Sequence, residues 1–268
     1  METPLLKEMK SGLLLCIQFF TIIPYKKEIP WEKKTIQWCL LTFPLIGLII
    51  GVIGWIQLWS LTTITPLSSL FVSFWILFYF VAISGGLHLD GWMDCSDAYF
   101  SYRDQDKRLE IMEDPRVGSF AVFSVLFLLG FRFLFIYELI QLNRALTFSA
   151  VLLIPVLSRG MVVFMLIKGK LAKDTGLAAA FQKGVSSHLF KVSALITLVI
   201  AASIGFFLHQ IGVTILLLVA SILFLIGFYS FCKKQFGGMN GDTLGALLEG
   251  GETFLWFVLW LLLYFVTA

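Results

Sequence analysis

The sequence predicts an all-α integral membrane protein, a polytopic helical bundle of about seven transmembrane spans with an interfacial or re-entrant helix before them. Hydrophobic residues make up 59% of the 268 residues, against about 45–50% in a soluble domain. The mean hydropathy is +0.90. Apolar runs near the ~20 residues that cross a bilayer recur along the chain. We expect residues 1–268 to form a single integral membrane domain.

The apolar runs give the order of the spans. The first run, 12–23, is too short to cross a bilayer comfortably and has lysines on both sides, so we expect an interfacial or re-entrant helix. A short helix packed on the bundle is equally compatible with this pattern. The expected spans follow at 36–60, 67–86, 117–139, 145–167, 190–209, 213–231 and 253–266.

Basic residues predict how the chain is oriented. If the N-terminus is cytoplasmic, only Arg144 of the 20 lysines and arginines falls in an outer loop, while Arg132 and Arg159 fall within spans. The positive-inside rule therefore predicts a multi-pass protein of the cytoplasmic (inner) membrane, with the lipid bilayer as its surroundings. The net charge of +3 gives no indication of nucleic-acid binding. Whether the chain forms a homo-oligomer stays open.

The same orientation places three polar segments on the cytoplasmic face, and the first, 84–118, contains an acidic stripe. Asp90, Asp94 and Asp97 are spaced i, i+4 and i+7, so on a helix the second and third lie at about 40° and −20° around the axis from the first and form one stripe. A solvated acidic face is one explanation. The adjacent Gly91 and the apolar run just before the stripe favour a metal site, because unpaired carboxylates are costly there. Oxygen ligands favour Mg²⁺.

A second acidic segment lies between the last two expected spans and reads F-G-G-M-N-G-D-T-L-G-A-L-L-E-G-G-E. Asp242 and Glu249 are seven residues apart, so they share a helix face, and Gly245 lies between them on the same side. A re-entrant turn with exposed acids is the alternative. Two acidic groups on one membrane face favour a shared site, to which Asn240 and Gly91 would also contribute.

Several basic side chains are candidates for binding phosphate. Arg108 and Arg116 lie in the charged block 103–116, where 105–113 has the pattern of a short amphipathic helix. Arg159 lies inside a span, where an arginine usually faces a cavity or an acidic partner, and its guanidinium suits bidentate phosphate binding. For Arg132 we expect a structural pair with Glu138. A solvated loop or a structural ion pair remains the alternative for each.

His88 lies two residues before the first aspartate and projects off the aspartate face. A satisfied interfacial histidine and a base or substrate contact both remain open.

These constellations together predict a Mg²⁺-dependent phosphotransferase that acts at the cytoplasmic face. Metal ions can clamp a diphosphate, and a carboxylate can take the proton of an attacking hydroxyl. A CDP-alcohol phosphotransferase acting on a lipid donor is an alternative, but Asp94 and Cys95 stand where that class has Ala-Arg. A divalent-cation transporter is the non-enzyme alternative, although the acids cluster at one face.

The two polar segments resemble those of the cobalamin synthase family, the adenosylcobinamide-GDP ribazoletransferases. The resemblance is carried by G-G-L-H-L-D-G-W-M-D-C-S-D-A, by R-L-E-I-M-E-D-P-R-V-G-S-F and by G-G-M-N-G-D-T-L-G-A with Glu249 and Glu252. Ala98 and Asn240 depart from the family's usual glycine and threonine. Neither departure removes a carboxylate.

This resemblance implies the last assembly step of the cobalamin nucleotide loop. A ribose hydroxyl of α-ribazole, or of its 5′-phosphate, would attack adenosylcobinamide-GDP, and GMP would leave. Asp90, Asp94, Asp97 and Asp242 would be the catalytic and Mg²⁺-binding residues, with Arg108, Arg116, Arg159, Gly91, Asn240 and Glu249 binding substrate. Which acceptor is preferred, how many metals bind and which carboxylate is the base stay undecided.

Overall fold

The chain is almost wholly helical in the computed structural model, which describes residues 3–266. The helices within this range, in chain order, are α1 (Pro4–Phe20), α2 (Lys33–Thr63), α3 (Ser69–Ile83), α4 (Leu87–Phe100), α5 (Gln105–Met112), α6 (Ser119–Leu142), α7 (Arg144–Lys168), α8 (Gly176–Lys183), α9 (Ser187–Phe207), α10 (Ile211–Phe236) and α11 (Gly241–Val266). The all-α fold class and the short helix expected at 105–113 are confirmed.

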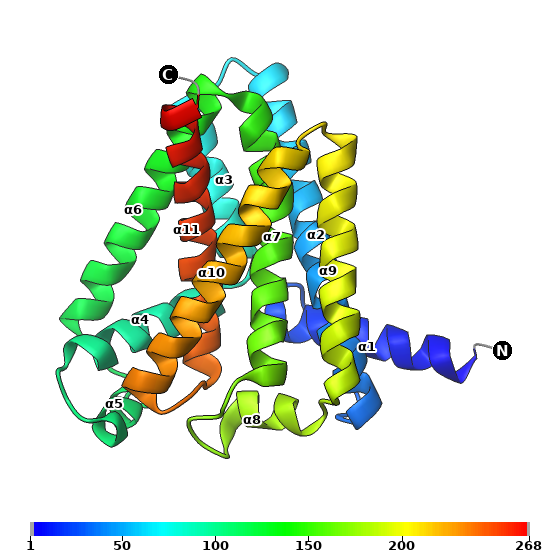
Figure 1. The fold of residues 1–268 in the computed structure, drawn as a ribbon, viewed down its shortest axis with the longest axis vertical. Helices are drawn as coiled ribbons and strands as arrows, with labels where there is room; N and C mark the ends of the chain where they lie inside the picture. Colours follow the sequence, from blue (N-terminus) through cyan, green and yellow to red (C-terminus); the bar gives the residue numbers. More distant parts are fainter. Residues whose placement is uncertain (1–2, 267–268) are drawn as a thin grey trace.

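Six of the described helices, α2, α6, α7, α9, α10 and α11, are long and apolar enough to cross a membrane. The pair α3 and α4 passes the same test together and would bring the number to seven. The long helices run up and down the molecule, with α7 in the middle of the bundle (Figure 1). The prediction of a multi-pass helical membrane protein is therefore confirmed.

The span expected at 67–86 is broken. Helix α3 ends at Ile83, and the chain turns through Gly85 and Gly86, whose φ angles are 64° and 78°. This left-handed conformation favours glycine because it lacks a Cβ atom. The turn bends α4 by 89° from α3, so α4 lies across the lower end of the bundle (Figure 1).

The last helix starts earlier than the sequence indicates. The span expected at 253–266 is the later part of a longer helix, since α11 is helical from Gly241. Asp242 and Glu249 therefore lie on one helix, as their spacing predicted, and the alternative of a re-entrant turn is wrong. Asn240 and Thr243 cap its start, since the Thr243 amide donates to the Asn240 side-chain oxygen at 2.9 Å. Glycines cost helical stability, but here they allow close packing: a Cβ atom at Gly250 would lie 2.8 Å from the Trp92 ring.

The remaining short helices gather at one end of the bundle. Helices α4, α5 and α8 lie at the lower end of the long helices, and α1 lies across them near the same end (Figure 1). The loop before α8 is tied to the turn before α11, because the Met239 amide donates to the Lys170 carbonyl at 2.7 Å and the Ala172 amide donates to the Met239 carbonyl at 2.8 Å. The acidic stripe, the lysine-rich loop and the start of α11 thus meet.

Candidate functional site

Helices α4 and α11 touch backbone to backbone. A Cβ atom at Gly91 would lie 2.6 Å from the Asp242 carbonyl oxygen, and one at Gly245 would lie 2.9 Å from the His88 carbonyl oxygen. Only glycine permits this separation at either position. The contact brings Asp90, the neighbour of Gly91, next to the start of α11, where Asp242 lies.

The acidic side chains at this contact repel one another. Asp94 is partly buried, and the charges of Asp90, Asp242 and Asp97 each act unfavourably on its carboxylate. Within residues 3–266 none of the four carboxylates forms an ion pair. The Asp242 carboxylate instead accepts a hydrogen bond of 3.1 Å from the Asn240 side-chain amide. The group therefore lacks positive charge.

Asp97 differs from the other members of the stripe. Its two carboxylate oxygens accept hydrogen bonds from the amides of Gly118 and Ala121, at 2.6 and 2.9 Å. These amides belong to the start of α6, whose unpaired N–H groups and dipole favour a negative charge. Asp97 therefore fixes α4 to the N-terminus of α6.

A cavity of about 330 Å³ lies beside Asp90 and Asp242. Its apolar lining residues include Phe20, Val162, Leu166, Phe181 and Leu244. Its polar lining residues include His88, Asp90, Glu113, Lys173, Thr175, Asn240 and Asp242. Lys173 pairs with Glu113 at 2.6 Å. Helices α1, α4, α7, α8 and α11, which are far apart in the sequence, thus contribute to one cavity.

His88 lines this cavity without a hydrogen-bonding partner. It is 5% exposed, and neither ring nitrogen has a hydrogen-bonding partner among residues 3–266, which excludes the satisfied histidine that the sequence left open. The ring stacks on Phe20 with a centroid distance of 6.2 Å.

The arginines of the charged block lie away from the cavity lining. Arg108 hydrogen-bonds to the Gln235 side chain, and its guanidinium lies 5.6 Å from the centre of the Tyr99 ring. Arg116 is exposed and donates from Nε to Asp114 at 2.9 Å. Its hydrogen bonds lower the pKa of Asp114 to about 2. Both guanidiniums lie on the loop-bearing end of the bundle.

Two further arginines form a buried ion-pair network in the bundle. Arg132 pairs with Glu249 at 2.8 Å and with Glu252 at 3.5 Å, and Arg159 pairs with Glu252 at 2.6 Å. All four side chains are at most 5% exposed. The network connects α6, α7 and α11. The pairing of Arg132 with Glu138 was wrong, because the Glu138 carboxylate instead accepts hydrogen bonds of 2.6 Å from Trp260 and Tyr264.

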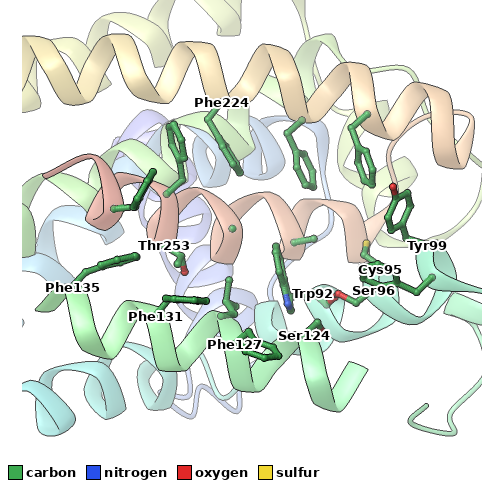
Figure 2. Close-up of a pocket in the computed structure, with 18 residues that line it drawn as sticks. Trp92, Cys95, Ser96, Tyr99, Ser124, Phe127, Phe131, Phe135, Phe224 and Thr253 are labelled. Atoms are coloured by element: carbon green, nitrogen blue, oxygen red, sulfur yellow. The ribbon is translucent and has the colours of Figure 1, made fainter. Parts of the chain in front are cut away.

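The face of α4 that lies away from its aspartates borders an apolar groove of about 700 Å³ (Figure 2). Phenylalanines of α6, α10 and α11 contribute to its lining, and Phe127 and Phe131 are exposed. Trp92 and Tyr99 of α4 complete it. No feature of the sequence pattern separated these aromatic residues from ordinary core or lipid-facing side chains.

Comparison with known proteins shows what the chain is related to. The family model of cobalamin-5-phosphate synthase matches residues 12–260. The chain belongs to the cobalamin-5-phosphate synthase family. Proteins named adenosylcobinamide-GDP ribazoletransferase from Geobacillus sp. (strain WCH70) and Halalkalibacterium halodurans are 43% and 40% identical, over 96% of this chain and 97% and 98% of theirs. One from Clostridium tetani is 34% identical over 94% of this chain and 97% of its own. No solved structure matches the chain.

In this member of the cobalamin-5-phosphate synthase family, the oxygen atoms of the acidic site suit a hard cation. The carboxylates of Asp90, Asp94 and Asp242 and the carbonyl of Asn240 offer only oxygen, and the carboxylates have no ion-pair partner among the described residues. Within residues 3–266 no three His, Cys, Asp or Glu side chains are grouped closely enough to hold a metal ion by themselves. Mg²⁺ does not require such a cage, since it keeps several waters and usually binds one or two carboxylates together with substrate phosphates.

Sequence reasoning missed part of the site of this family member. Lys173 and Thr175 line the cavity but carried no motif, and Glu113, which also lines it, lay in a quoted motif without being assigned a role. The lysine-rich loop indicated only orientation. A signal was nevertheless present: a polar loop on the same membrane face as two acidic segments.

Proposed function

We propose that this protein is an adenosylcobinamide-GDP ribazoletransferase of the cytoplasmic membrane, with its N-terminus and active site at the cytoplasmic face. The observation that supports this most is the meeting of Asp90 and Asp242 at one cavity edge in a chain whose relatives carry that name. In the reaction, an acceptor hydroxyl oxygen forms a bond to the phosphorus that bears cobinamide. The diphosphate P–O bond breaks, and GMP leaves with the electron pair.

The carboxylates have different tasks in this proposal. Asp90 and Asp242, with Asp94 next to them, would hold Mg²⁺, and one of these carboxylates takes the proton of the attacking hydroxyl. Mg²⁺, when bound, neutralises charge on the transferred phosphate and on the leaving GMP. Asn240 keeps the Asp242 carboxylate in position through its 3.1 Å hydrogen bond. Asp97 is the fourth member of the site, and its bonds to α6 fix the angle at which α4 presents the stripe.

The basic residues also separate into two groups. Arg108 and Arg116 lie at the loop-bearing end with α5, and they bind the phosphates of the donor as it approaches. Arg159 and Glu249 are engaged in the buried network. There they position α11, and through it Asp242, without touching the phosphates. The network contains two arginines and two glutamates, so its charges balance. Burial of charged groups in a membrane requires such compensation.

The direct test is an assay of nucleotide release by the purified protein. With adenosylcobinamide-GDP, α-ribazole and Mg²⁺, the protein is expected to release GMP and to form adenosylcobalamin. Replacing α-ribazole by its 5′-phosphate gives the preferred acceptor. A CDP-linked lipid with an alcohol acceptor serves as the contrasting pair of substrates. CMP release from the lipid donor without GMP release from the cobinamide donor would overturn the proposal.

A further inference from the structure

The imidazole of His88 is a buried polar group that the fold leaves unsatisfied. It is 5% exposed, and both of its nitrogens lack a partner within residues 3–266. Nearly all buried polar side chains in folded proteins are hydrogen-bonded, because an unpaired one loses its interaction with water. The ring lines the cavity that also contains Asp90 and Asp242. A ligand in that cavity can supply the missing partner.

The shape of the cavity restricts which ligand this is. Its volume of about 330 Å³ lies at the lower end of the range of about 300–1,000 Å³ for small-molecule sites. A nucleoside is of this size, whereas a corrinoid carrying a nucleoside diphosphate is far too large to be enclosed. The lining includes the apolar residues Phe20, Val162, Leu166 and Phe181. The aromatic rings among them suit a planar heterocycle.

The same cavity also has polar lining residues. Asp90, Asp242, Asn240, Lys173 and Thr175 all contribute to its lining. A nucleoside bound here could pack its base on the apolar side chains and present its ribose hydroxyl groups to the polar ones. The lining therefore combines apolar side chains for a base, polar side chains for a sugar, and one imidazole without a partner among residues 3–266.

We propose that this cavity is the acceptor subsite and that His88 is a substrate-binding residue which hydrogen-bonds the α-ribazole nucleoside. The inference rests on the proposed function. A neutral imidazole offers one N–H donor and one acceptor nitrogen, so it can bond either a ring nitrogen or a ribose hydroxyl. The cobinamide donor stays outside the cavity and meets the acceptor at Asp90 and Asp242.

Two substitutions at His88 separate this role from a purely structural one. His88→Phe keeps the ring that stacks on Phe20 and removes both nitrogens. His88→Gln keeps hydrogen-bonding capacity and removes the ring. If His88 only fills space, His88→Phe removes an unsatisfied buried group and leaves the kinetics unchanged. His209→Asn is the matched control, since His209 is exposed and has a φ of 54° that asparagine tolerates.

The measurement is GMP release with each substrate varied in turn, together with equilibrium binding of α-ribazole. His88→Phe is expected to raise the KM and the Kd for α-ribazole by about three- to tenfold, the loss of one hydrogen bond. The KM for adenosylcobinamide-GDP stays at the wild-type value. His88→Gln recovers part of the loss in acceptor binding, and His209→Asn changes neither constant. Thermal unfolding of each variant confirms that the fold is intact.

Two outcomes would overturn the inference. One is an unchanged α-ribazole KM and Kd in His88→Phe, and the other is a rise in the KM of the cobinamide donor alone. If His88→Phe does not fold, the comparison passes to His88→Gln, for which an α-ribazole Kd raised more than tenfold in a folded protein contradicts the proposed hydrogen bond. Failure of the proposed function is a separate result, since wild-type protein would then release no GMP.

Discussion

The main chain of Gly91 lies against the main chain of Asp242, so that a Cβ atom at position 91 would come within 2.6 Å of the Asp242 carbonyl oxygen. This contact joins the acidic helix that leaves one span to the helix that enters another. The relative position of Asp90 and Asp242 depends on it. A residue with no side chain is thus a determinant of the site's geometry.

Gly91→Ala tests this contact. The new methyl group must push α4 and α11 apart, because the atom it meets is backbone. We expect GMP release to fall by about a hundredfold, since small displacements of reacting groups have effects of that size. Gly227→Ala is the control: nothing lies within 4 Å of its Cβ position, so activity stays at the wild-type level. Full activity of Gly91→Ala would show that the contact does not set the geometry.

Removal of Mg²⁺ is expected to stop the reaction. In the part of the chain that the structure describes, the carboxylates of Asp90, Asp94 and Asp242 form no ion pair, and a diphosphate would bring further negative charge next to them. Treatment with EDTA should abolish GMP release, and added Mg²⁺ or Mn²⁺ should restore it. Turnover that persists in EDTA would contradict the magnesium proposal.

Asp97→Asn tests whether Asp97 holds α4 against α6 or takes part directly in the chemistry. An asparagine retains one acceptor oxygen but meets the second α6 amide with an NH₂ group. We expect the free energy of unfolding to fall by about 1 kcal/mol, as for a weakened helix cap, while kcat falls by less than about tenfold. In contrast, Asp94→Asn is expected to lower kcat strongly and to change the free energy of unfolding little. A large loss of kcat in Asp97→Asn without loss of stability would instead indicate direct metal contact.

The buried network should be sensitive to removal of one partner. Glu252→Ala leaves Arg159 and Arg132 with excess positive charge, and we expect it to destabilise the protein by about 3–5 kcal/mol. The double variant Glu252→Leu with Arg159→Met removes one negative and one positive charge. It should therefore lower the free energy of unfolding by less than Glu252→Ala does. Thermal unfolding in detergent measures both. Equal stability of Glu252→Ala and wild type would show that the network does not hold α11.

The sequence predicted much of the fold, because transmembrane spans are a matter of length and hydropathy. It also predicted the stripe of Asp90, Asp94 and Asp97, since helical spacing fixes which residues share a face. It could not predict that α11 begins at Gly241, because glycine weakens a helix locally and the compensating contacts with α4 are distant in sequence. The partners of Arg132 were missed for the same reason: they lie on another span.

The measurement that tests the central claim most directly is a double-mutant cycle on kcat/KM for GMP release, with Asp90→Asn, Asp242→Asn and the combination of both. If both carboxylates serve one centre, each single variant loses about 10²–10⁴-fold, and the double variant loses little more than either one, because groups that act as a unit are not additive. Losses that multiply in the double variant, or a single variant with wild-type activity, would contradict a shared centre.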